Sequence, residues 1–72
     1  MSRRKKLIQA AVDRAGSQKK LADAIGLSQQ GVSWLLRNAA RVSAETAIAI
    51  DRFTKGEVPK EKLRPDIFGD AS

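Results

Sequence analysis

Residues 18–37, QKKLADAIGLSQQGVSWLLR, contain the pattern that decides the fold. Leu21 and Ile25 recur at the spacing that places two side chains on one face of a helix. Gly26 follows them, where a helix commonly ends in a left-handed backbone conformation that glycine adopts without strain. Ser28 is then a good N-cap for a second helix. Two short helices joined by a tight turn predict a helix-turn-helix, whose second helix enters the major groove of DNA.

The first of these two helices is expected over 18–25, because Ser17 ahead of it is a good N-cap. The second is expected over 29–37, with Val32 and Leu35 on the face that packs into the core. The opposite face carries side chains that can form hydrogen bonds: Gln29, Gln30, Ser33 and Arg37. A glutamine early in such a helix can donate to and accept from an adenine edge at once, whereas the alternative interpretation is an ordinary solvated face.

Three further helices complete an all-α fold of five short helices, forming a single domain over 1–72. Apolar residues at helical spacing predict a helix over about 4–15. Ser43 caps the fourth helix, and Gly56 is expected to end it. A proline in its first turn favours a fifth helix over about 59–63, which stops ahead of the next proline.

The composition of the 72 residues limits the function classes. There are 14 Lys and Arg against 8 Asp and Glu, a net charge of +6 that favours a polyanionic partner such as nucleic acid. The chain has no His or Cys, which excludes disulfides and zinc sites built from thiolate or imidazole. With no Tyr, glycine-rich phosphate loop or paired carboxylates in a recognisable motif, we expect no enzyme activity, cofactor, metal or small-molecule ligand. No apolar run approaches the roughly 20 residues of a membrane span, so we expect no membrane association.

Both ends of the chain leave alternatives open. The basic head over 1–6 is either a solvated terminus or an arm whose cations contact phosphates or the minor groove. The tail over 64–72 is expected to be flexible or dimerising. Its Ile67 and Phe68 either fold back on the domain or pack against a second subunit.

Three features around the second helix of the pair also carry open interpretations. Trp34 does not lie on the central core face, and we expect it to cover the rim of the core, with the DNA backbone or a partner chain as alternatives. Gly31 disfavours a helix by about 1 kcal/mol relative to alanine, so a side chain there is expected to collide with DNA or with the preceding helix. Residues 38–42 are expected to form a loop, in which Arg41 either reaches a phosphate or is solvated.

The stretch SQKKLADAIGLSQQGVSWLLR, residues 17–37, resembles the helix-turn-helix of Cro/cI-type phage repressors and, more broadly, the small YdaS-like regulators. The shared marks are Gln at the start of the first helix, Ala22 inside it, Gly26 at the turn and SQQ at the opening of the second helix. The later segments ARVSAETAIAIDRFTKGEV and LRPDIF also look like the YdaS-like group, so the resemblance covers about 17–68. It implies a lambda-repressor-like DNA-binding domain.

By position, the resemblance implies that Gln18 binds a phosphate and supports Gln29 through a side-chain contact. The residues that would face base edges are Gln29, Gln30 and Ser33, and those that would touch the backbone beyond the helix are Arg37 and Asn38. The full set of candidate DNA-contact residues is Gln18, Lys19, Ser28, Gln29, Gln30, Ser33, Arg37 and Asn38. Trp34 departs from the family pattern, in which that position is usually polar.

The expected function is therefore a sequence-specific regulator of transcription that binds double-stranded DNA. The resemblance implies a Cro-like phage or prophage repressor that acts as a homodimer on a near-palindromic operator, in the bacterial cytoplasm at the nucleoid. The alternative is a toxin, antitoxin or anti-repressor that uses a helix-turn-helix core to bind protein. RNA binding has less support, because RNA readers commonly stack bases on aromatic side chains and the three aromatic residues here are far apart.

Overall fold

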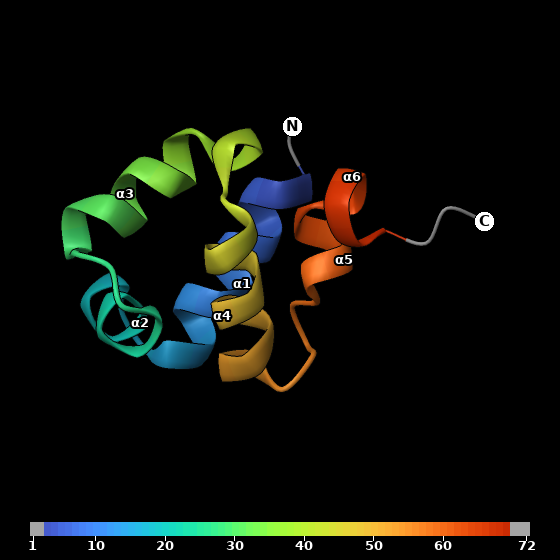
Figure 1. The fold of residues 1–72 in the computed structure, drawn as a ribbon. Helices are drawn as coiled ribbons and strands as arrows, with labels where there is room; N and C mark the ends of the chain where they lie inside the picture. Colours follow the sequence, from blue (N-terminus) through green and yellow to red (C-terminus); the bar gives the residue numbers. More distant parts are fainter. Residues whose placement is uncertain (1–2, 70–72) are drawn as a thin grey trace.

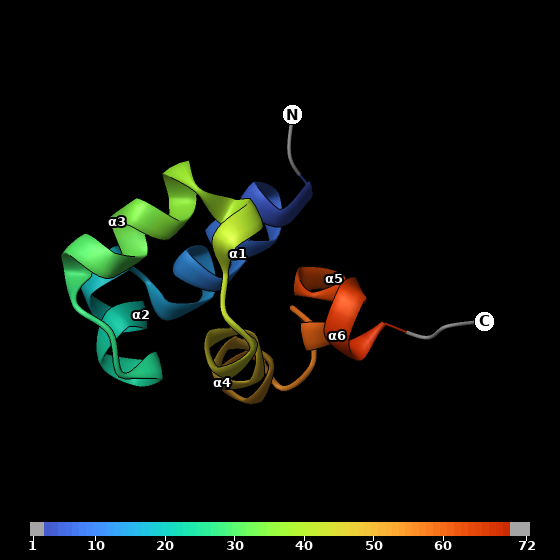
Figure 2. The same ribbon diagram turned by 45° about the horizontal axis from the view of Figure 1, so that its top comes forward.

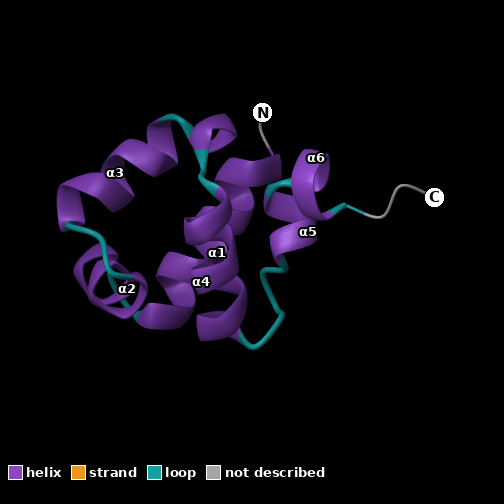
Figure 3. Cartoon of the chain, viewed as in Figure 1, coloured by secondary structure: helices purple, strands orange, loops and turns teal. Residues whose placement is uncertain are grey.

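Every regular element in residues 3–69, the part of the chain that the computed structural model describes, is helical (Figures 1 and 3). The elements are α1 (Arg3–Ala15), α2 (Gln18–Ile25), α3 (Gln29–Arg37), the short 3₁₀-helix η1 (Ala39–Arg41), α4 (Ala44–Thr54), α5 (Lys60–Leu63) and α6 (Pro65–Phe68). The prediction of an all-α fold is confirmed. The predicted number of five helices is wrong, because the described residues form six α-helices and one 3₁₀-helix.

The two helices of the helix-turn-helix have the predicted bounds, and capping explains both starts. Ser17 Oγ accepts a hydrogen bond from the Lys20 backbone N–H at 3.1 Å, and Ser28 Oγ accepts one from Gly31 N–H at 3.0 Å. Between the helices, Gly26 has φ of +77°, the left-handed conformation that ends α2. The local sequence thus fixes both the length of α2 and the point where α3 begins.

The end of α4 and the segment after α3 differ from expectation. Helix α4 ends at Thr54 rather than at Gly56, because Lys55 already takes the left-handed conformation, with φ of +54°. The Gly56 N–H then closes the helix end by donating to the Asp51 carbonyl at 2.9 Å. Residues 38–42, expected as a loop, contain η1, and Val42 at its end is buried.

Parts of both terminal segments form helices within the described residues. Helix α1 starts at Arg3, so residues 3–6 of the expected basic head lie on helical backbone rather than in an extended arm. Within the expected tail, Pro65–Phe68 form α6, and Phe68 packs partly against the core while Ile67 is 50% exposed. Residues 1–2 of the head and 70–72 of the tail lie outside the described part.

The core lies where α1 to α5 meet, with α2 and α3 on one side of α1 and α4, and α5 and α6 on the other (Figures 1 and 2). Each of these helices contributes buried apolar side chains, one more comes from η1 and two come from connecting segments. The buried apolar residues are Ile8, Ala11, Val12, Leu21, Ala22, Val32, Leu35, Ala39, Val42, Ala47, Ile50, Val58 and Leu63. Helix α3 therefore packs against the core through one face only. Its other face points outward, at the end of the molecule that is farther from α6.

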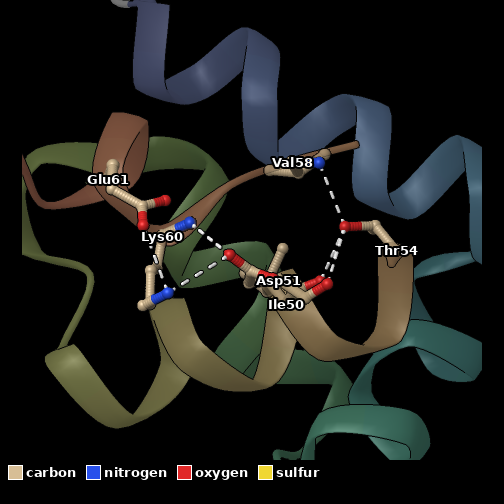
Figure 4. Close-up of polar contacts among 6 residues, drawn as sticks. All are labelled: Ile50, Asp51, Thr54, Val58, Lys60 and Glu61. Atoms are coloured by element: carbon tan, nitrogen blue, oxygen red, sulfur yellow. Dashed lines mark hydrogen bonds and ion pairs between the residues drawn. The ribbon is translucent and has the colours of Figure 1, made fainter. Parts of the chain in front are cut away.

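Thr54 organises the turn from α4 to α5 (Figure 4). Its side chain is fully buried, and its hydroxyl donates to the Ile50 carbonyl at 2.8 Å and accepts from the Val58 N–H at 3.0 Å. Nearby, the Asp51 carboxylate accepts from the Lys60 backbone N–H at 3.0 Å and lies 3.8 Å from the Lys60 Nζ. These contacts hold the connection against the core, so that Val58 is also buried.

Candidate nucleic-acid interface

The outward face of α3 carries polar side chains that the fold does not use. Gln29, Gln30 and Arg37 are exposed and Ser33 is half-buried. Within the described residues, none of these four side chains takes part in a hydrogen bond, whereas the neighbouring Ser28 is occupied as the helix cap. Their donors and acceptors remain available to an external partner.

The residues expected to contact DNA from outside α3 have mixed environments. Lys19 is exposed in the first turn of α2 and Gln18 before it is half-buried. No hydrogen bond joins Gln18 to Gln29 within residues 3–69, so the supporting contact between them stays a prediction. Asn38 donates its side-chain N–H to the Trp34 carbonyl at 3.0 Å, which gives it a capping role at the end of α3.

Trp34 is the large apolar residue on this face. A helix turns by about 100° per residue, which puts Trp34 about 160° from the buried Val32 and about 100° from the buried Leu35, one turn away from both Gln30 and Arg37. Its side chain is 44% exposed and does not belong to the set that packs around the core. The rest of its surface is covered, so the expectation that Trp34 covers the rim of the core stays a prediction.

Gly31 lies against the turn rather than against α2. A Cβ atom on Gly31 would meet Ser28 Oγ at 3.3 Å and Leu27 Cβ at 3.6 Å, with no atom of α2 among the nearest neighbours. The collision with the preceding helix that we expected is wrong. A side chain here would crowd the N-cap of α3, and a collision with DNA stays a prediction.

Charge is distributed unevenly between the two sides of the molecule. From residue 24 to residue 44 the sequence has no acidic residue, and this span includes the turn, α3 and η1. The exposed cations Lys19, Lys20, Arg37 and Arg41 make no ion pair within the described residues. These four cations therefore give the helix-turn-helix and η1 a positive charge, with Asp23 of α2 as the one acidic residue in the sequence between Lys20 and Arg37.

The ion pairs of the described residues lie elsewhere. Arg14 of α1 contacts Glu57 at 2.6 Å, and Lys60 contacts two carboxylates at the start of α5. Arg64 donates to the Val42 carbonyl at 2.7 Å and also binds Asp66, and this hydrogen-bonded guanidinium lowers the pKa of Asp66 to about 2. These contacts attach α5 and α6 to the core, on the side away from the helix-turn-helix.

Comparison with known proteins assigns the chain to a family. The model of the family described as "Bacterial toxin YdaS" matches residues 8–72. The chain belongs to the YdaS family. One curated relative, the "Putative transcriptional regulator YdaS" of Escherichia coli (strain K12), is 40% identical over 52 residues, which is 72% of this chain and 53% of that protein. The chain thus spans about half the length of the curated relative that it matches, and no solved structure matches it.

The described residues of this YdaS family member were searched for a membrane-spanning helix and for a metal-binding group. No helix in residues 3–69 is both long and apolar enough to cross a membrane. The same residues bring together no group of three or more Asp or Glu side chains that could hold a metal ion.

Sequence reasoning ranked Trp34 as a packing residue and left Lys20 and Arg41 out of the candidate set. The signal that finds Arg41 is its place inside the stretch without acidic residues, and the signal that finds Lys20 is its place next to the candidate Lys19.

Proposed function

We propose that this YdaS family member is a sequence-specific regulator of transcription that binds double-stranded DNA through α3. The observation that carries the proposal is the outward face of α3, whose polar side chains have no partner in the described residues and lie in a span without acidic residues. The description of the E. coli relative as a transcriptional regulator supports the same function.

In this proposal α3 lies in the major groove with its first turn against the base edges. Gln29 and Gln30 supply base contacts, since a glutamine amide can bond adenine N6 and N7 together. Lys19 and Arg37 contact phosphates and supply affinity without sequence preference. Two subunits would place two copies of α3 about 34 Å apart on one face of a near-palindromic operator. Occupation of that operator would block transcription, as a Cro-like repressor of a phage or prophage does, in the bacterial cytoplasm.

The test begins with selection of DNA from a random duplex library by the purified chain, followed by titrations at several salt concentrations. Loss of one bidentate base contact, in Gln29→Ala or Gln30→Ala, should weaken the selected DNA by about 5- to 150-fold and random DNA hardly at all. Lys19→Ala should weaken both DNAs and reduce the slope of log K against log salt by about 0.9.

Lys62→Ala is the matched control for Lys19→Ala. Lys62 is also exposed and makes no ion pair within residues 3–69, but it belongs to α5 on the other side of the molecule. Its loss should leave the salt slope unchanged. Equal losses on selected and random DNA for both glutamine variants, or an equal change of slope for both lysine variants, would contradict this assignment of roles.

A second function is favoured by the family description, which is that of a toxin. In this alternative the chain acts on growth by binding a protein, and the helix-turn-helix serves as a scaffold. Expression of the wild type and of a Gln29→Ala/Gln30→Ala double variant separates the two. If the double variant no longer binds DNA but still inhibits growth, the result supports the toxin. If the double variant loses both DNA binding and growth inhibition, the result supports the regulator.

A further inference from the structure

We propose that Trp34 is a specificity-determining residue that contacts the 5-methyl group of thymine in the major groove. This inference rests on the proposed function, in which α3 is the helix that enters the groove. It adds Trp34 to the residues of α3 that contact base edges, and it names thymine as the base that Trp34 recognises.

The first argument is the place of Trp34 on α3. Side chains three and four residues apart are neighbours on a helix surface, so Trp34 lies between Gln30 and Arg37. Both of those side chains are exposed, and the buried Val32 and Leu35 point the opposite way. Any partner that Gln30 and Arg37 contact together must therefore also meet the indole ring.

The second argument is the exposure of this ring. Trp34 is 44% exposed, and it is absent from the residues that pack around the core. Its backbone is nevertheless held, because its carbonyl accepts from both the backbone N–H of Asn38, at 2.9 Å, and the Asn38 side chain, at 3.0 Å. The ring is a large apolar group presented outward from a capped helix end.

The third argument concerns what such a ring can recognise. Major-groove base edges present hydrogen-bond donors and acceptors, which suit Gln30, and one apolar group, the thymine methyl. The surroundings favour DNA over a protein surface as the occupant, because the exposed cations Arg37 and Arg41 follow Trp34 in the sequence and no acidic residue lies between positions 24 and 44. Burial of one methyl group against the indole corresponds to about a fourfold gain in affinity.

The experiment uses deoxyuridine, which lacks the 5-methyl group. Each thymine of a duplex selected by the wild-type chain is replaced singly, and affinity is measured at one salt concentration for three proteins. These are the wild type, Trp34→Ala, and the control Ile67→Ala, which removes an equally exposed apolar side chain from α6. If Trp34→Ala loses helical circular dichroism, Trp34→Gln takes its place.

We expect at least one replacement to weaken the wild type and Ile67→Ala by about fourfold, and to leave Trp34→Ala nearly unchanged. The inference is overturned if the wild type is indifferent to every replacement or if Trp34→Ala shows the same losses. It is also overturned if Trp34→Ala changes the sedimentation of the free protein, which would assign the ring to a second copy of the chain. A library without any enriched duplex refutes the proposed function, and this inference with it, whereas enrichment without thymine dependence refutes this inference alone.

Discussion

Replacement of Thr54 by valine tests the account of how the second half of the chain is held to the first. Valine has nearly the shape of threonine, so the packing of the buried site is retained while the hydroxyl is lost. The Ile50 carbonyl keeps its acceptor role inside α4, but the Val58 N–H loses the hydroxyl that it bonds at 3.0 Å. Since Val58 is only 2% exposed, water cannot replace that acceptor without a local rearrangement.

A buried donor left without a partner destabilises a protein by about 1–3 kcal/mol, and we expect Thr54→Val to lie near the middle of that range, about 2 kcal/mol. In a domain of this size, that loss corresponds to a fall in Tm of about 8–16 °C. Thr54→Ser is the matched control, because it keeps the hydroxyl and loses one methyl. It should lose about 1 kcal/mol, a fall in Tm of about 4–8 °C.

Thermal unfolding followed by circular dichroism, together with urea titrations, gives both values. The decisive result is the order of the two variants, not either value alone. If Thr54→Val is as stable as Thr54→Ser or more so, the hydroxyl does not carry the connection between α4 and α5, and apolar packing of Thr54 explains its burial.

Other predictions follow from single contacts. The pKa of Asp66 is about 2 in the fold, below its ordinary value of 3.8, so the pair with Arg64 stabilises the fold above about pH 4 and is lost as pH falls toward 2. The difference in unfolding free energy between wild type and Asp66→Asn should therefore close over that interval in urea titrations at stepped pH. Gly26→Ala should destabilise by about 1–2 kcal/mol through backbone strain alone, because φ is +77° and nothing lies within 4 Å of the new Cβ. Lys55→Gly should change stability in the opposite direction, by up to about 1 kcal/mol, because glycine relieves the left-handed conformation of a non-glycine residue. A common melting series for these last two variants checks both signs.

Residue pattern was sufficient for the part of the fold that local rules determine. Ser17, Ser28 and Ser43 each mark a helix start in the sequence, and each accepts the capping bond that the rule predicts. The spacing of apolar residues placed α2 and α3 on the chain to the residue. The same helical spacing separates the outward face of α3 from its buried face, so it also identifies the candidate DNA-contact residues on this helix.

What the pattern missed depends on contacts between distant residues. Leu63 and Val58 have no helical repeat around them, and only the packing of α5 against the core buries them. The ion pair of Arg14 with Glu57 joins residues 43 positions apart, which no local rule connects. The left-handed Lys55 has no sequence signal of its own, because a lysine at a helix end is usually read as a helical residue.

The separation between the two faces of α3 has a consequence for how such a protein can diversify. Val32 and Leu35 carry the packing of this helix, while Gln29, Gln30 and Arg37 have no bond to the rest of the described chain. Substitutions at these three outward positions are therefore expected to be nearly neutral for stability. Under the proposed function, changes at Gln29 and Gln30 can give new operators one at a time, without compensating mutations in the core.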